Sequence, residues 1–403
     1  MQWVVLCWQM SGTLPGRGLT AEAPLPAAVV SHLKQGTAVR LTLFGESHGP
    51  AVGAVLEGIA PGTPIDEAAV ADAMERRRAK GKISTARSEP DKVHFLSGVY
   101  NARATGSAIA FVIENTNARS ADYEKTSGLL RPGHADYTAR VRYKGFADPH
   151  GGGHFSGRLT APLVAAGAIC AGMLRACGVH IATRLQACAG VHDTGEWAQG
   201  AALAAQLDAL AQKEYPVLDD EAGARMQSAV LEAAAEGDSV GGVLETAVCG
   251  LPAGLGQPFF GSVESTLAAL LFSIPAVKGV EFGAGFALAD MRGSAANDAF
   301  RMKGGKIVTA TNHNGGVNGG ITNGMPVVFR TAVKPTPSIY REQNTVDADA
   351  MVNAAISIHG RHDPCIAHRA RAVQDALTAF ALADLAAQQF GERWQEAPVW
   401  NTD

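Results

Sequence analysis

Residues 131–160 read RPGHADYTARVRYKGFADPHGGGHFSGRLT and follow neither the two-residue period of a strand nor the 3.6-residue period of a helix. The stretch contains three histidines, five arginines or lysines and two acids. Its glycine run, 151–153, permits positive φ angles and lets consecutive backbone N–H groups turn toward an anion. It therefore predicts an anion-binding loop that carries titratable imidazoles. A solvated basic loop with a flexible hinge is the alternative interpretation.

The composition of the 403 residues, with 47% hydrophobic and 18% charged residues, is that of a folded, loop-rich protein. The net charge of −4 gives no global reason to expect nucleic acid as a partner. An anionic ligand must therefore be bound by a local cluster of cations. The six cysteines form no CxxC pair, which favours free thiols in a reducing compartment over a zinc site. The sequence contains no run of eighteen apolar residues, so no membrane span is predicted.

Residues 1–36 differ from the rest of the chain. The first ten are apolar but lack a basic segment, and those that follow are rich in Pro, Gly and Ala. We interpret 1–36 as a disordered extension, either a poor targeting segment or, as we favour, the product of an upstream start codon, and we expect a cytoplasmic protein. No linker or repeat divides residues 37–403, which predicts one catalytic domain.

Apolar runs alternate with polar loops throughout 37–403. The two-residue period predicts strands over 38–44, 51–57, 93–99, 108–114, 240–251, 283–292 and 326–334. Helical patterns and caps predict helices over 67–79, 160–177, 201–212, 221–235, 262–272, 347–357 and 371–389. The helix at 160–177 is apolar nearly all round and is expected in the interior. The mixture predicts one large α+β domain.

Two further loops carry charged or titratable groups. GESHGP, residues 45–50, separates the first two predicted strands and would display His48 at the tip of a hairpin. RRRAKGK, residues 76–82, places five cations at a helix end. Each cation near the end of a helix stabilises the helix dipole by about 0.3–1 kcal/mol, and fewer than five cations would be enough for that purpose. The cluster therefore predicts a bound anion.

Several other kinds of site are disfavoured. GxGxxG, P-loop and HExxH signatures are missing from the sequence. His150 and His154 are separated by three glycines and would not share a helix face, and Asp148 alone is near enough to be a further metal ligand. Ser47 and His48 are adjacent on an extended turn and would point apart, which disfavours a nucleophile and its base. The remaining cations and histidines suit elimination of phosphate from a polyanionic small molecule.

From about residue 37, the chain resembles the chorismate synthase family in a long series of motifs. In order, they are GESHGP, MERRR, LSGVYN, IENT, RPGHADYT, GGGHFSGRLTAP, GDSVGG, AVKGVEFG, NHNGGVNGGITNG, KPTPS and GRHDPC. The resemblance implies a β-α-β sandwich, with two antiparallel sheets around a helical layer, assembled as a homotetramer. It also implies anti-1,4-elimination of phosphate from 5-enolpyruvylshikimate 3-phosphate, the last step of the shikimate pathway. That reaction requires reduced FMN and involves no net redox change.

The resemblance also assigns roles to individual residues. His48 would assist the departing phosphate, His134 would supply a proton to the reduced flavin, and Asp363 would act beside flavin N5. Substrate carboxylate or phosphate would be bound by Arg77, Lys82, Arg158 and Arg369. FMN contacts would come from His154, Phe155, Ser156, Pro275, Ala276, Gly319, Lys334, Pro335, Thr336, Pro337, Ser338 and Arg361. NADPH is a candidate electron source, and because no added domain is evident, an external flavin reductase is the expected partner.

Three positions depart from the family pattern. Many members have Arg-Ser-Ser-Ala-Arg-Glu where this chain has residues 154–159, HFSGRL. Pro275 replaces a common Asn and removes a side-chain contact to flavin, while Lys82 replaces a frequent Arg and offers a point charge in place of a bidentate fork. The implied reaction is unchanged by these differences.

Overall fold

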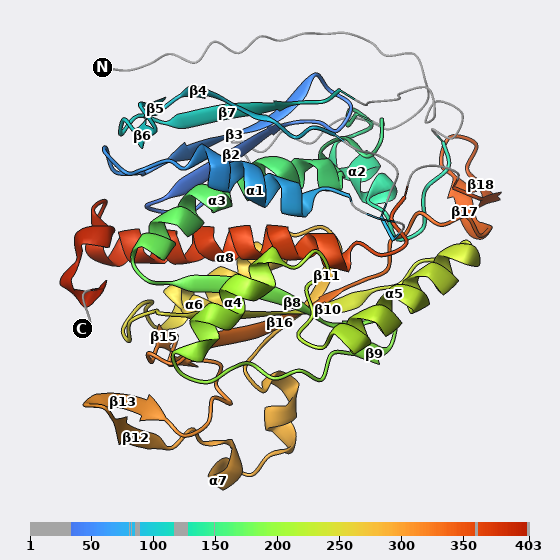
Figure 1. Ribbon diagram of the computed structural model, residues 1–403. Helices are drawn as coiled ribbons and strands as arrows, with labels where there is room; N and C mark the ends of the chain where they lie inside the picture. The colour runs from blue at the N-terminus through green and yellow to red at the C-terminus, as the bar shows by residue number, and fades with distance from the viewer. Residues whose placement is uncertain are drawn as a thin grey trace. The chain divides into compact units, whose positions relative to one another are not determined.

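Two five-stranded antiparallel sheets enclose a layer of helices (Figure 1). The first sheet has the order β1 (Lys34–Gln35), β2 (Arg40–Gly45), β3 (Ala51–Glu57), β7 (Ile109–Glu114), β4 (Val93–Ser97). The second has the order β11 (Val277–Phe282), β16 (Val327–Val333), β10 (Gly242–Cys249), β8 (His180–Cys188), β9 (Val191–His192). The α+β sandwich implied by the resemblance is confirmed.

The computed structural model describes residues 34–79, 81, 83–84, 89–116, 128–148, 150–358 and 362–400, all within one compact unit, Leu33–Asp403. Most of the extension predicted at 1–36 lies outside these ranges, and the division of the chain at residue 37 stays a prediction. The helices are α1 (Glu67–Arg77), α2 (Asp136–Arg142), α3 (Thr160–Ala176), α4 (Ala202–Gln212), α5 (Asp220–Ala235), α6 (Val263–Leu271), α7 (Gly293–Ala296) and α8 (Ala367–Phe390). Short 3₁₀ helices are η3 (Gly153–Phe155), η4 (Gly157–Leu159), η5 (Phe259–Gly261), η6 (Gly285–Asp290), η7 (Trp394–Glu396) and η8 (Pro398–Trp400).

Helices α3 and α8 form the centre of the helical layer, and α1 packs beside them. At Gly167 of α3 an added methyl group would lie 2.4 Å from the Cβ of Ala376 in α8, so only glycine permits this close approach. By length and apolar composition α3 could cross a membrane, but 67% of its most apolar window is buried inside the protein. It is therefore a core helix, as its all-round apolar pattern predicts. Helix α4 covers the outer face of the second sheet.

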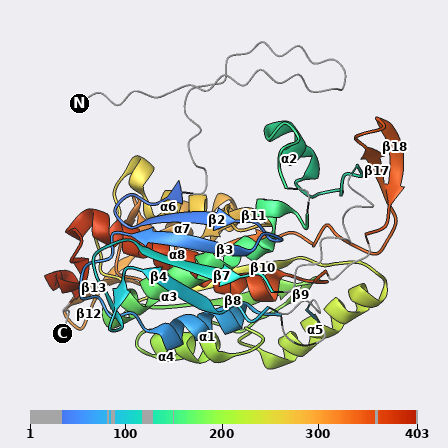
Figure 2. The same ribbon diagram turned by 90° about the horizontal axis from the view of Figure 1, so that it is seen from above.

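Four small hairpins complete the fold. They are β5 (Val99–Tyr100) with β6 (Arg103–Ala104), β12 (Phe300–Lys303) with β13 (Lys306–Thr309), β14 (Val317–Asn318) with β15 (Ile321–Thr322), and β17 (Gln343–Asp347) with β18 (Val352–Ile356). Figure 2 shows α2 and the β17–β18 hairpin together, to one side of the two sheets.

The helix predicted over 347–357 is wrong, because this segment forms the β17–β18 hairpin. The carboxylate of Asp347 accepts hydrogen bonds from the backbone N–H groups of Asp349 and Ala350, both 2.9 Å, and Met351 has a φ of 56°. This local turn competes with the helix that the alanines favour.

Two other expectations also fail. The strand predicted over 283–292 is instead the 3₁₀ helix η6, and the strand of that region is β11. Positive φ angles at Gly283 and Gly285 end the extended run. The short helix α2 was not predicted, because of its seven residues Ala139 alone is buried and no apolar stripe marks it.

Five cysteines in the described part of the chain are free thiols, as expected, and Cys170, Cys188 and Cys365 are buried. Cys7 lies outside the described residues.

Candidate active site

Loops that are distant in the sequence meet where α3 and α8 begin. The backbone N–H of Ser47 donates to the carbonyl oxygen of Gly153 over 3.2 Å, which joins the 45–50 turn to the glycine run. The N–H of Val240 donates to the carbonyl oxygen of Pro364 over 2.9 Å, which joins GDSVGG to GRHDP. These contacts bring together the polar loops that the sequence separates by up to about three hundred residues.

His48 lies in a tight turn closed by a 3.1 Å hydrogen bond from Gly49 N–H to the carbonyl oxygen of Glu46. The turn brings Ser47 Oγ within 2.9 Å of His48 Nδ1, so the expectation that these side chains point apart is wrong. The error arose from treating 45–50 as extended. Ser47 itself is fully buried, and its hydroxyl also faces the carbonyl oxygen of His150 at 3.4 Å. The contact orients the imidazole but leaves Ser47 no open path to a substrate.

The backbone of the glycine run lies against two imidazoles. A methyl group on Gly151 would lie 2.1 Å from Cε1 of His48, and one on Gly152 would lie 3.3 Å from Cε1 of His134. Both glycines have positive φ angles, 66° and 112°. Side chains at these positions would therefore displace the rings as well as strain the backbone. The glycine run brings His48 and His134 into one site.

His134 is held by an acid that the sequence reasoning did not single out. Its Nδ1 lies 2.7 Å from Oδ1 of Asp136, and the guanidinium of Arg131 binds the same carboxylate with two hydrogen bonds of 2.6 and 2.8 Å. Burial would raise the pKa of Asp136, but the bonds from Arg131 and His134 hold that pKa well below its usual range. Because a carboxylate only accepts, Nδ1 of His134 carries a hydrogen, which leaves Nε2 to face the site.

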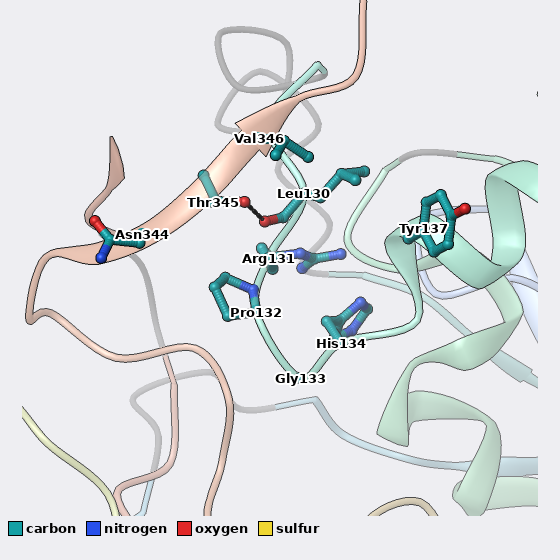
Figure 3. A pocket seen from close by; sticks show the side chains of 9 residues that line it. All are labelled: Leu130, Arg131, Pro132, Gly133, His134, Tyr137, Asn344, Thr345 and Val346. Atoms are coloured by element: carbon teal, nitrogen blue, oxygen red, sulfur yellow. Dashed lines mark hydrogen bonds between the residues drawn. The ribbon is translucent and has the colours of Figure 1, made fainter. Parts of the chain in front are cut away.

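A hollow of about 450 Å³ lies beside His134, between the 131–134 turn, α2 and β17 (Figure 3). Tyr137 lines it from α2 and Asn344 from β17. Hydrogen bonds between Leu130 and the strand hold the two sides together: the N–H of Leu130 donates to Val346 O over 3.2 Å, and Thr345 Oγ1 donates to Leu130 O. This open hollow is wide enough for a ring system to approach His134.

A second acid outside the predicted set is Asp91, which binds two of the predicted substrate cations. Its Oδ2 accepts from Arg77 Nη2 over 2.7 Å, and its Oδ1 accepts from Arg158 Nη1. The side chains of Asp91 and Arg158 are 2% and 4% exposed. Burial lowers the pKa of Arg77 to about 10 even beside this acid. For Asp91, burial acts to raise the pKa, but Arg77 and Arg158 together hold it below its usual value.

Asp363 is joined to the same cationic group. Its Oδ2 accepts from Arg369 Nη1 over 2.7 Å, and Arg369 Nε donates to the carbonyl oxygen of Arg77 over 3.1 Å. His362 is half-buried, and burial together with the positive charge of Arg131 lowers its pKa below the usual value. Arg77, Arg158, Arg369 and Asp363 therefore form one connected set.

The turn at Lys334–Ser338 lies against the His134 turn. Lys334 Nζ donates to the carbonyl oxygen of Gly133, and Lys334 N–H donates to that of Ala276 over 2.9 Å. Ala276, which follows Pro275, has a φ of 75°. The hydroxyl of Thr336 is buried and has no hydrogen-bond partner among the described residues. An orphaned donor beside a lysine suits an anionic ligand such as a phosphate-bearing cofactor.

His154 and Phe155 follow the glycine run directly, in η3. The His154 ring contacts Tyr143 edge-on at 5.0 Å and Phe155 at 4.4 Å, and its Nδ1 lies 4.0 Å from Glu46. Ser156 Oγ accepts from the N–H of Arg158 and caps η4. His150 instead contacts Asp148 at 2.6 Å, so the two histidines face different acids. Among the described residues no group of three or more His, Cys, Asp or Glu is placed to bind a metal.

One predicted residue, Gly319, lies apart from this site. Gly319 lies in the β14–β15 hairpin, which Figure 1 places at the opposite end of the second sheet from α2 and β17. Lys82 and Arg361 lie outside the described residues.

Comparisons with known proteins agree with this geometry. The family model described as chorismate synthase matches residues 39–387. The chain belongs to the chorismate synthase family. A chorismate synthase of Aeropyrum pernix is 47% identical over 350 residues, covering 87% of this chain and 91% of that protein. One from Chitinophaga pinensis is 47% identical over 349 residues, covering 87% and 95%. A solved structure, "Crystal Structure of Chorismate Synthase", matches with a TM-score of 0.68 at 26% identity, covering 89% of this chain and 94% of that chain.

Membership in the family gives the reaction of this protein. It is a carbon–oxygen lyase that eliminates phosphate from 5-enolpyruvylshikimate 3-phosphate to give chorismate, the last step of the shikimate pathway toward the aromatic amino acids. Its substrate is a small molecule, and the family uses a reduced flavin. The connected arginines and the two imidazoles suit that reaction, because its substrate is polyanionic and phosphate leaves more easily when it is protonated or charge-balanced.

Sequence reasoning missed Asp91, Asn115 and Asp136 as parts of this site. A signal existed for Asp136, which lies two residues after His134 in a stretch with few acids. No comparable local signal marks Asp91 or Asn115, because their partners lie 67 and 43 residues away at Arg158.

Proposed function

We propose that His48, His134 and Asp363 are the catalytic residues of this protein, with reduced FMN as its flavin. The observation that carries the proposal is the glycine run, which contacts the imidazoles of His48 and His134 through adjacent residues. When bound, reduced FMN supplies electron density and a ring nitrogen that accepts a proton. The other steps of the reaction depend on residues of this chain.

His48 balances the charge of the departing phosphate or protonates it from Nε2, because its Nδ1 faces Ser47. Proton transfer at His134 would use Nε2, since Nδ1 is bound to Asp136. Asp363, whose carboxylate is bound by Arg369, would tune the flavin nitrogen that accepts the proton. The two histidines would act as general acids or bases, roles that typically contribute about 10²–10⁴-fold each.

The cationic residues Arg77, Lys82, Arg158 and Arg369 are proposed to bind the substrate carboxylates and phosphate. Arg77 and Arg158 share the single charge of Asp91, which leaves this buried group with a net positive charge. That surplus favours an anion close by. Each arginine already has protein partners. To contact the substrate directly, its guanidinium must either bind the substrate in addition to these partners or exchange one of them for it.

FMN is proposed to lie against the turns at Pro275–Ala276 and at Lys334, Pro335, Thr336, Pro337 and Ser338. His154, Phe155, Ser156 and Arg361 are proposed as further contacts. The fit is supported by the orphaned hydroxyl of Thr336 and the amine of Lys334 in the same turn. A cation close to the ring stabilises the negative charge of a reduced flavin.

We also propose a cytoplasmic homotetramer supplied by an external flavin reductase, with NADPH as the electron source of that reductase. Assembly is supported by the β12–β13 hairpin, where Phe300, Met302 and Ile307 are 65%, 70% and 67% exposed. Exposed apolar side chains grouped on a hairpin are typical of a subunit interface. Gly319, at the far end of the sheet, would reach a flavin only from a neighbouring copy.

An anaerobic titration tests the cofactor proposal. Reduced FMN with substrate should give chorismate, oxidised FMN with NADPH should give none, and adding a flavin reductase should restore turnover. Turnover with flavin rigorously excluded would contradict the cofactor proposal. Turnover with oxidised FMN and NADPH alone would show that the protein reduces its own flavin and would remove the external reductase.

A further inference from the structure

Asn115 lies directly opposite the turn that carries His48. Strands β3 and β7 pair with Ala51 opposite Glu114, so Asn115 is the first residue beyond the ladder and faces Pro50. Its backbone N–H donates to the carbonyl oxygen of Pro50 over 3.0 Å. The register of the sheet therefore places this side chain beside the 46–49 turn.

One amide group holds both ends of that turn. Asn115 Nδ2 donates to the carbonyl oxygen of Glu46 over 3.0 Å and to that of Gly49 over 2.7 Å. Glu46 and Gly49 are also the two residues that close the turn by their own backbone hydrogen bond. Ser47 and His48 lie between them. The Asn115 amide thus clamps the two ends of the loop that carries the imidazole.

The orientation of the amide is set by a buried ion pair. Arg158 Nε donates to Asn115 Oδ1 over 2.7 Å, and a guanidinium cannot accept a hydrogen bond. Oδ1 must therefore face Arg158, and Nδ2 must face the two carbonyl oxygens. Arg158 is itself held by Asp91 and by the carbonyl oxygen of Glu114 at 3.0 Å. The chain of contacts Asp91–Arg158–Asn115 ends at the His48 turn.

We propose that Asn115 is a positioning residue for His48, and that Asp91 and Arg158 also support catalysis by holding its amide in place. The inference rests on the catalytic role proposed for His48. Loss of the two donors frees the turn while the sheet and the glycine run remain, so the imidazole leaves its productive position. Displacements of about 1 Å at a reacting group can reduce rate about 10²-fold.

Two substitutions of Asn115 distinguish the role of its Nδ2 donors from that of its Oδ1 acceptor. Asn115→Ala removes the whole clamp, whereas Asn115→Asp retains the acceptor for Arg158 and removes both donors. We expect kcat to fall at least tenfold in each variant, with KM for substrate and Kd for reduced FMN changed less than threefold. Gln206→Ala is the matched control, because that amide also holds a loop by bonds to Ala198 N–H and Glu196 O, on the outer helix α4. It should leave kcat within twofold.

A double-mutant cycle distinguishes positioning of His48 from general structural damage. In a His48→Ala background, Asn115→Asp should change kcat less than twofold, because the group it positions is already gone. A full tenfold further loss in that background would overturn the inference, as would an unchanged kcat in both single variants. If Asn115→Ala does not fold, Asn115→Asp carries the test alone.

Hydrogen exchange separates this inference from the role of His48. Asn115→Asp should raise exchange of the backbone amides of residues 45–50, and Gln206→Ala should not. If His48→Ala retains full turnover, the catalytic role of His48 is wrong and the clamp is judged by exchange. Unchanged exchange at 45–50 would overturn the clamp.

Discussion

Lys334 Nζ donates a 2.5 Å hydrogen bond to the carbonyl oxygen of Gly133, and so joins the 334–338 turn to the turn that carries His134. The two segments are 201 residues apart in the chain. The bond brings a cation and a rigid proline turn to the turn that carries His134, and that second turn lines the hollow.

Lys334→Met should therefore weaken binding of reduced FMN about tenfold, because a hydrogen bond from a charged group contributes about 1.5–3 kcal/mol. Fluorescence or absorbance titration under anaerobic conditions measures this Kd. Lys213→Met is the control, since Lys213 makes a similar 2.9 Å contact to a carbonyl oxygen, that of Val217, away from the site. Equal Kd values for Lys334→Met and the wild type would count against the proposed flavin turn.

His134→Ala and Asp363→Ala should each reduce turnover at least tenfold while the proposed tetramer survives, because the first removes a proposed proton donor and the second removes the carboxylate proposed to tune flavin N5. Steady-state assays with saturating reduced FMN give the rates, and light scattering gives the assembly. His192→Ala, at the exposed end of the second sheet, should be neutral. Near-normal rates in both active-site variants would refute the assignment of roles.

Gly151→Ala should reduce kcat more than tenfold, because the added methyl group meets the His48 ring at 2.1 Å and the φ of 66° disfavours a side chain. Gly190→Ala shares the positive φ, 79°, but has open space around its Cβ. Both variants should lose about 1–2 kcal/mol of stability for the backbone alone. Only Gly151→Ala should lose activity, so equal activity in the two would show that the contact with His48 is unimportant.

Asp91→Asn should destabilise the protein by about 3–5 kcal/mol at pH 7, because two buried guanidinium groups lose their counter-charge. The folded-state pKa of Asp91 lies below its ordinary value of 3.8. Its ionised form therefore stabilises the fold fully above that value, and the stabilisation is lost as the pH falls through the folded-state pKa. Urea unfolding should show a difference between wild type and variant that shrinks below about pH 3.8.

Asp349→Asn is the matched control for that measurement. Its partner Arg140 and the carboxylate are 44% and 62% exposed, and such surface pairs contribute about 0–1 kcal/mol. If the difference in unfolding free energy between wild type and Asp91→Asn did not change with pH, Asp91 would not be the ionised partner of the two arginines.

Phe300→Glu combined with Ile307→Glu should reduce the apparent mass of the assembly, because both side chains project from the β12–β13 hairpin. Sedimentation velocity measures the change. Leu231→Glu, an exposed apolar position on α5, should leave the mass unaltered. An intact tetramer in the double variant would place the interface elsewhere.

The order of short motifs was enough to predict the family, the reaction and the α+β sandwich. The buried helix α3 could also be predicted, because its apolar residues surround the helix and no partial stripe is left for solvent. His48 was correctly placed between two strands, since β2 and β3 alternate on either side of a glycine-bracketed turn. These features depend on residues close together in the chain.

Only the tertiary structure decided how the side chains are paired. Asp91 meets Arg158 across 67 residues, and Arg369 meets Arg77 across 292, which no local period can encode. The 347–357 hairpin shows the same limit, because the side chain of Asp347 and pairing with Leu130 overrode the helix preference of alanine. Local sequence determines which elements and loops form. Long-range packing determines which charge meets which partner, because a buried ion must find its counter-ion wherever the fold places one.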